Sequence, residues 1–169
     1  LAMAAIDLDV TAVERDEVTA AIAVYNLAPW PNARVLHDDV ENFAVDTVDG
    51  VWFDPARRTT AKGKTVHRSR NPEDWSPSLD VAFSLAQRVP AGVKLGPGVD
   101  RGIIPDDAEA QWVSVDGEVV EVALWFGALA RNGVRRAATI VGSHGSAELT
   151  APRDSEDAEV RDLGEFVYE

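Results

Sequence analysis

The most constraining feature of this sequence is an abrupt change of hydrophobic period near residue 15. Residues 7–14 are apolar and partly β-branched, as in a buried strand, and they end on an acid, Glu14. In residues 16–25 the apolar side chains instead recur at helical spacing, at Val18, Ala21, Ile22 and Tyr25. Asp16 and Glu17 lie in the first turn, where the helix dipole stabilises negative charge. A strand that passes directly into a helix is typical of the β-α-β unit of parallel sheets.

The alternation of strands and helices continues along the chain. Further strands are expected at residues 34–37, 50–53, 93–95, 110–115 and 136–141. Helices are expected at residues 79–86 and 119–126, with a helical turn at residues 40–44. This order predicts an α/β fold, with a mostly parallel sheet that is covered by helices on both faces.

The length of 169 residues suits one domain with a full core, and we place this domain at residues 1–148. From Ser146 the hydrophobic pattern weakens. Residues 149–169 are acidic and contain a proline, which predicts a linker that leads to a further, absent C-terminal domain. Leu1 already lies inside an apolar segment, so we expect an upstream part of the domain before it.

Composition restricts the classes of function. The chain has no cysteine, which excludes disulfides and thiolate chemistry, and it has no apolar run long enough to cross a membrane. We therefore expect a cytoplasmic protein without membrane contact. The three histidines lie far apart without the spacing of metal ligands, so no metal site is expected.

The net charge of −13 disfavours contact with a phosphate backbone, because affinity for nucleic acid depends on Lys and Arg. One polar and aperiodic stretch, residues 56–76, is nevertheless basic, and we expect it to form a long loop. Its cationic and imidazole side chains are Arg57, Arg58, Lys62, Lys64, His67, Arg68 and Arg70. If RNA is a partner, residues 57–70 and a missing domain would carry the contact.

Residues that follow the strands are the first candidates for a ligand site, because ligands of open α/β sheets bind beyond the carboxyl ends of the strands. Glu14 ends the first strand, where a carboxylate can accept hydrogen bonds from both hydroxyls of a ribose. Asp39, after the second strand, suits an adenine amino group, and Asp54 with Pro55 follows the third. This order matches the contacts expected along an adenosine nucleoside. Each residue alone also fits a helix cap or a turn.

Three of these segments carry a specific resemblance. Residues 13–16 (VERD), 37–40 (HDDV) and 53–58 (FDPARR) resemble the post-I, II and IV motifs of class I S-adenosylmethionine-dependent methyltransferases. Further segments are similar to the actinobacterial members that carry a C-terminal THUMP-like domain, at residues 75–77, 93–98, 112–118 and 124–127. The similarity covers nearly the whole chain.

The resemblance implies a Rossmann-like class I methyltransferase fold that is truncated at its N-terminus, because the glycine-rich loop of the family would precede Leu1. It implies S-adenosyl-L-methionine as the cofactor. Glu14 and its neighbour Arg15 would then lie at the ribose. Asp39 or its neighbour Asp38 would bind the adenine edge.

The same resemblance assigns Asp54 and Pro55 to the acceptor side of the site, and the chemistry and position of Lys94, Arg57 and Arg58 make them further candidates. Asp54, with Pro55, would shape the pocket in which the acceptor meets the cofactor, and Asp54 would hold the acceptor or take its proton. Lys94 would face the same cleft. Arg57 and Arg58 would hold phosphate or carboxylate groups of the substrate bidentately.

THUMP-like appendages resemble modules that deliver structured RNA, so the leading prediction is an RNA methyltransferase. Residues 54–57 (DPAR) depart from the pattern of base methyltransferases, which show Pro-Pro and an aromatic residue there, and this departure leaves the acceptor open. Two alternatives remain: an NAD(P)-dependent Rossmann oxidoreductase, whose strand-end acid also binds ribose, and a non-catalytic RNA-binding or scaffold module. An upstream Gly-x-Gly-x-x-Gly loop would favour the oxidoreductase.

Overall fold

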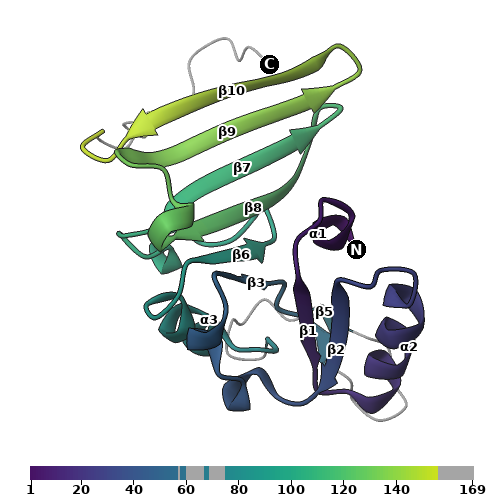
Figure 1. The fold of residues 1–169 in the computed structure, drawn as a ribbon. Coiled ribbons are helices and arrows are strands. Elements are labelled where there is room, and N and C mark those ends of the chain that lie inside the picture. Colours follow the sequence, from purple (N-terminus) through teal and green to yellow (C-terminus); the bar gives the residue numbers. More distant parts are fainter. Residues whose placement is uncertain (57, 60–66, 69–74, 156–169) are drawn as a thin grey trace. The chain divides into compact units, whose positions relative to one another are not determined.

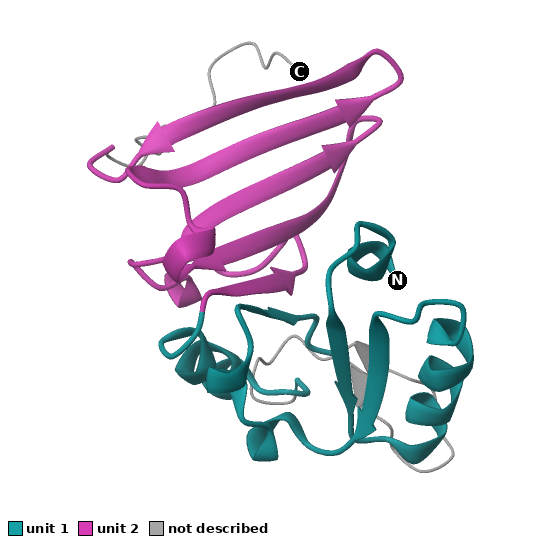
Figure 2. Cartoon of the chain, in the orientation of Figure 1, with its two compact units in different colours: residues 1–89 teal, residues 90–169 magenta. Residues whose placement is uncertain are grey.

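The computed structural model describes residues 1–56, 58–59, 67–68 and 75–155 of the chain. The chain forms two compact units, Leu1–Val89 and Pro90–Glu169, which Figure 2 shows in different colours. The units differ in how their strands pair, and each is considered by itself below.

The first unit contains the predicted strand-helix-strand arrangement (Figure 1). Its elements are α1 (Ala2–Ala5), β1 (Val10–Glu14), α2 (Glu17–Leu27) and β2 (Ala33–His37). β1 and β2 pair in parallel, from Val10 opposite Ala33 to Glu14 opposite His37. α2 connects the two strands and contacts both of them. The change of period near residue 15 therefore predicted β1, α2 and β2 correctly, although the strand expected at residues 7–14 begins at Val10 and α1 was not predicted.

Asp16 caps the N-terminus of helix α2, because its carboxylate accepts hydrogen bonds from the backbone N–H and the hydroxyl of Thr19, both at 2.8 Å. The apolar spacing that predicted this helix does not mark its buried face. Val18 is 67% exposed and Tyr25 is 81% exposed, whereas Ala20 and Leu27 are buried. Apolar residues occur on every side of this helix, so their spacing predicts the helix but does not select the side that is buried.

The remainder of the first unit contains short elements and one further helix. These are η1 (Val40–Asn42), η2 (Val45–Thr47), β3 (Val51–Phe53), β4 (Arg58–Thr59), β5 (His67–Arg68) and α3 (Leu79–Ala86). The helical turn at 40–44, the third strand and the helix at 79–86 are confirmed. α3 begins at Ser78, whose side chain accepts from the N–H of Val81, and it buries Leu79, Ala82, Leu85 and Ala86.

The described residues of the basic stretch at 56–76 include paired backbone within the predicted loop. Ala56 and Ser76 form an antiparallel bridge at its base, with N–H to carbonyl distances of 2.8 and 3.1 Å. Within it, β4 pairs with β5 in antiparallel fashion. Arg57, Lys62, Lys64 and Arg70, and the side chains of Arg58, His67 and Arg68, lie outside the described residues.

The second unit is a twisted sheet of long strands (Figure 1). Its elements are β6 (Ala91–Leu95), η4 (Arg101–Ile103), β7 (Glu109–Val115), β8 (Glu118–Phe126), η5 (Gly127–Leu129), β9 (Val134–Gly142) and β10 (Gly145–Pro152). Its strands lie in the order β10-β9-β7-β8-β6. β7 and β9 run parallel, but the other neighbouring pairs are antiparallel. The prediction of a mostly parallel sheet with helices on both faces is therefore wrong here, because residues 90–155 contain no α-helix.

The helix predicted at residues 119–126 is strand β8. Asp116 and Gly117 form a two-residue loop between β7 and β8, with Val115 opposite Glu118 and positive φ angles of 49° and 88° at the loop residues. Positive φ at both central positions is the geometry of a type I′ hairpin turn, for which Asp-Gly is a preferred sequence. The Asp116-Gly117 dipeptide therefore indicates a hairpin, and this signal is stronger than the helical spacing of the apolar residues at 119–126.

The chain also remains ordered beyond the predicted end of the domain at residue 148. β10 continues to Pro152 and pairs with β9 around a two-residue loop at Ser143 and His144, so the predicted boundary falls inside a strand. Most side chains of β10 are small or polar, which fits its exposure along most of its length. Leu149 is 75% exposed. Residues 156–169 lie outside the described residues.

Candidate functional site

The carboxyl ends of β1 and β2 meet at one edge of the parallel pair, as the sequence predicted. The ladder ends with Glu14 opposite His37. Beyond it, the N–H of Asp38 donates to the carbonyl of Glu14 at 3.1 Å, and His37 Nε2 lies 3.1 Å from the carbonyl oxygen of Arg15. The structure therefore brings the residues that follow the two strands into direct contact.

Glu14 is partly exposed, and its side chain turns toward the start of α2. Its Oε1 accepts a hydrogen bond from the backbone N–H of Asp16 at 2.8 Å. The pKa of Asp16 is lowered, mainly by the hydrogen bond from the Thr19 N–H and then by that from the Thr19 hydroxyl. Two carboxylates are thus held at the beginning of α2, where the helix dipole favours negative charge.

Asp38 and Asp39 are bound by the turn that follows β2. Asp38 Oδ1 accepts from Asn42 Nδ2 at 2.9 Å and from the N–H of Asp39 at 2.7 Å. These two bonds, that of Asn42 first, lower the pKa of Asp38, so its carboxylate is charged at neutral pH. Asp39 caps η1, because its Oδ1 accepts from the N–H of Glu41 at 3.1 Å. Its Oδ2 lies 3.8 Å from Arg15 Nη1.

The other predicted site residues lie elsewhere. Asp54 directly follows β3 with an exposed side chain, and Pro55 is buried. Arg57 and the side chain of Arg58 lie outside the described residues. Lys94 lies in β6, opposite Ala123 of β8, and is partly exposed. Lys94 and Asp54 belong to different units, so the expectation that they face the same cleft stays a prediction.

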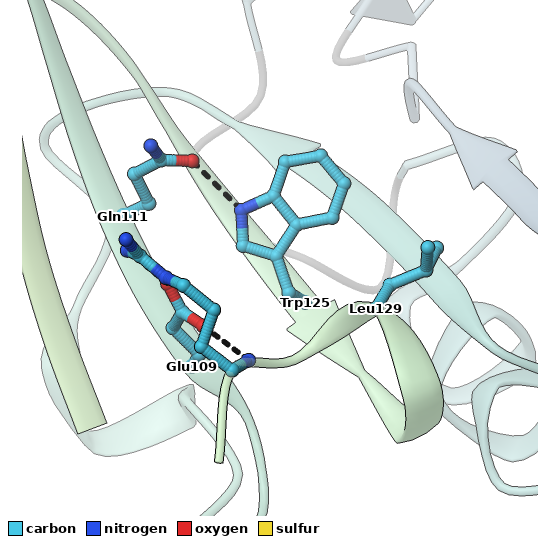
Figure 3. A pocket seen from close by; sticks show the side chains of 5 residues that line it. Glu109, Gln111, Trp125 and Leu129 are labelled. Carbon is cyan, nitrogen blue, oxygen red and sulfur yellow. Dashed lines mark hydrogen bonds and ion pairs between the residues drawn. The ribbon is translucent and has the colours of Figure 1, made fainter. Parts of the chain in front are cut away.

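A second polar site, in the second unit, was not predicted from the sequence. An open hollow of about 190 Å³ is lined by Glu109, Gln111, Trp125, Leu129 and Arg131 (Figure 3). Glu109 is only 2% exposed although it carries a charge. One of its oxygens accepts a hydrogen bond from the backbone N–H of Arg131 at 2.7 Å, and the other accepts one from Nε of the same residue at 2.8 Å.

The hydrogen bonds of this hollow continue across the sheet to β10. Arg131 also binds the carboxylate of Glu148, which accepts from the hydroxyl of Thr139 at 2.8 Å. Gln111 donates to Thr139 at 2.9 Å and accepts from the indole N–H of Trp125 at 2.8 Å (Figure 3). Hydrogen bonds from Arg131, and then from Thr139, lower the pKa of Glu148.

The side chains that line the hollow therefore connect neighbouring strands. The bonds to Glu109 and then to Glu148 raise the pKa of Arg131, so the guanidinium is charged and bound on two sides. Among the described residues, each buried side-chain nitrogen or oxygen has a hydrogen-bond partner. Buried charge that is fully paired within the protein indicates a structural role. The available sequence signal was Glu109 and Gln111, which are polar at alternate positions of a strand.

Two further features of the described residues bear on function. In this part of the chain no group of His, Cys, Asp or Glu side chains is arranged to hold a metal ion. No helix among the described segments has the length and apolar composition needed to span a membrane.

Curated relatives are similar to nearly the whole chain. They are two Mycobacterium tuberculosis proteins, from strains H37Rv and CDC 1551, and each is named an uncharacterized S-adenosylmethionine-dependent methyltransferase. Each is 31% identical over 163 residues, which cover 91% of this chain but 42% of the relative. The chain thus spans less than half the length of these relatives. No protein-family model and no solved structure matches it.

Proposed function

We propose that this chain is part of a class I S-adenosylmethionine-dependent methyltransferase and that the shared edge of β1 and β2 binds the nucleoside of the cofactor. The observation that carries the proposal is the gathering of Glu14, Asp38 and Asp39 at this edge. The names of the Mycobacterium tuberculosis relatives support it. The glycine-rich loop of such an enzyme would come from residues before Leu1.

The described residues fit a nucleoside. Glu14 uses one oxygen for the N–H of Asp16, and a carboxylate has further lone pairs with which to accept ribose hydroxyls. Asp38 and Asp39 are likewise engaged through Oδ1, by backbone N–H groups and by Asn42. An Oδ2 of this pair would accept the adenine amino group, and Asp39 Oδ2 lies 3.8 Å from Arg15 Nη1.

The bound cofactor would supply a methyl group activated on a sulfonium. The protein then has to align the acceptor with it and to hold or remove one proton. We assign this task to Asp54 at the end of β3, with Pro55 shaping the pocket and Lys94 facing the acceptor.

RNA is the proposed acceptor. Arg57 and Arg58 would hold its phosphates, within the basic stretch that extends to residue 70. An acidic chain needs such a local basic surface, and a THUMP-like domain after this chain would supply more. Binding to structured RNA should weaken steeply as salt rises, and Arg57→Ala with Arg58→Ala should reduce that salt dependence.

The deciding experiment is calorimetric titration of the full-length protein that contains this chain. S-adenosylhomocysteine should bind and raise the melting temperature, whereas NAD should do neither. Binding of NAD alone would favour a nicotinamide-dependent oxidoreductase. Binding of neither compound would sink the proposal and leave a non-catalytic module as the better explanation.

A further inference from the structure

His37 is placed to influence the nucleoside site without belonging to the predicted set of ligand-binding residues. It is the last residue of β2 and lies opposite Glu14 in the parallel ladder. Its ring reaches past the end of that ladder, where Nε2 lies 3.1 Å from the carbonyl oxygen of Arg15. A carbonyl oxygen only accepts hydrogen bonds, so Nε2 must carry the proton in this contact.

The bond of His37 acts at the segment that sets the direction of the Glu14 side chain. The carbonyl of Glu14 is held by the N–H of Asp38, and the guanidinium of Arg15 lies near Asp39. The Arg15 guanidinium is mostly exposed, so its ion pair at 3.8 Å contributes little order. The ring of His37, although exposed, makes a direct contact with the peptide carbonyl that follows the ladder.

We propose that His37 is a positioning residue for nucleoside binding, which holds the turn after β1 so that the Glu14 carboxylate faces the ribose. The inference rests on the proposed function. The hydrogen bond that the N–H of Asp16 donates to the Glu14 carboxylate depends on the path of the chain between the two residues, and Arg15 lies between them. Losing the ring contact frees that path, so the carboxylate must be ordered again when the nucleoside binds.

Substitutions at residue 37 separate this role from simple packing. Glutamine places an amide N–H close to the position of Nε2, so His37→Gln can still donate to the Arg15 carbonyl. Asparagine is too short to reach it, and His37→Ala removes the donor. His144 is an exposed histidine in the loop between β9 and β10, and His144→Ala serves as the matched control.

The test is the affinity of the full-length protein for S-adenosylhomocysteine, measured by calorimetry beside thermal unfolding without ligand. The dissociation constant should rise about five-fold in His37→Ala and His37→Asn, the effect of ordering roughly one side chain on binding. It should stay within about two-fold of wild type in His37→Gln and His144→Ala. If His37→Ala does not fold, the asparagine variant takes its place.

Two results overturn the inference in distinguishable ways. If the wild type binds and the asparagine or alanine variants bind equally well, or glutamine restores nothing, His37 does not position the site although the proposed function stands. If the wild-type protein does not bind S-adenosylhomocysteine, the proposed function fails and the role of His37 fails with it.

Discussion

The two units use carboxylates in opposite ways. In the first unit Glu14, Asp38 and Asp39 lie beyond the ends of strands, exposed or partly exposed, and each is engaged mainly through one oxygen by nearby groups of the turn. In the second unit Glu109 lies within the sheet, buried, with both oxygens bound to Arg131. A carboxylate at a strand end keeps an oxygen that can accept hydrogen bonds from a ligand, whereas both oxygens of the carboxylate inside the sheet are bound by the protein.

This difference predicts that substitutions of acids in the first unit affect function, whereas substitution of the buried acid in the second unit affects stability. Removing a strand-end acid should change binding or turnover and leave the free energy of unfolding almost unchanged. Removing the buried Glu109 of the second unit should do the reverse. The following experiments test the separation, from the largest expected effect to the smallest.

Asp54→Ala in the full-length protein should reduce methyl transfer by at least about 100-fold, because it removes the group proposed to hold the acceptor proton. Its affinity for S-adenosylhomocysteine should remain within about two-fold of wild type. A radiolabelled methyl-transfer assay and calorimetry measure the two quantities. Full turnover in this variant would remove Asp54 from the acceptor site.

Glu109→Ala should lower the free energy of unfolding by about 3 kcal/mol, because it leaves Arg131 without its buried partner. Urea denaturation measures the loss. Glu118→Ala, an exposed glutamate in the same sheet, is the matched control and should change stability by less than about 0.5 kcal/mol. Equal stabilities for the two variants would contradict a structural role for the hollow.

Glu14→Ala should weaken binding of S-adenosylhomocysteine roughly ten-fold, since a hydrogen bond to a charged group contributes about 1.5–3 kcal/mol. The free energy of unfolding should fall by less than about 0.5 kcal/mol, because Glu14 is not buried. Glu118→Ala again provides the comparison, with unchanged affinity. An unchanged affinity in Glu14→Ala would place the nucleoside elsewhere.

The smallest effect is a pH dependence of the second unit. The pKa of Glu148 is lowered by Arg131 and Thr139, so its ionised form stabilises the fold above the ordinary glutamate pKa of about 4.3. This contribution is lost as the pH falls from about 5 through the lowered pKa. Glu148→Gln should flatten the stability curve over this range in acid denaturation. A curve parallel to that of the wild type would show that the pairing is too exposed to matter.

The sequence predicted the first unit better than the second for a physical reason. β1, α2 and β2 follow one another along the chain. The change of period near residue 15, with Glu14 at the end of the strand, was therefore enough to predict their topology. β8 was predicted as a helix because its apolar residues also fit helical spacing, and the signal that decides between the two was the Asp-Gly turn before it. β10 was missed because an exposed strand has little hydrophobic pattern.

The candidate sites divide in the same way. Acids at the ends of adjacent parallel strands must meet at one edge, so the closeness of Glu14 to Asp38 follows from topology alone. The contacts of Arg131 with Glu109 and with Glu148 depend on the register of β7, β9 and β10, which local sequence does not reveal. The contact of His37 with Arg15 depends on a ring orientation that likewise requires coordinates.

The double attachment of Glu109 to Arg131 also restricts how this sheet can evolve. Because the carboxylate receives both a backbone N–H and a guanidinium N–H of residue 131, lysine supplies only part of the required geometry. Loss of the arginine leaves the buried carboxylate of Glu109 without its partner, unless position 109 changes in the same lineage. In an alignment of descendants, positions 109 and 131 should therefore be inherited as a pair, while position 118 varies independently.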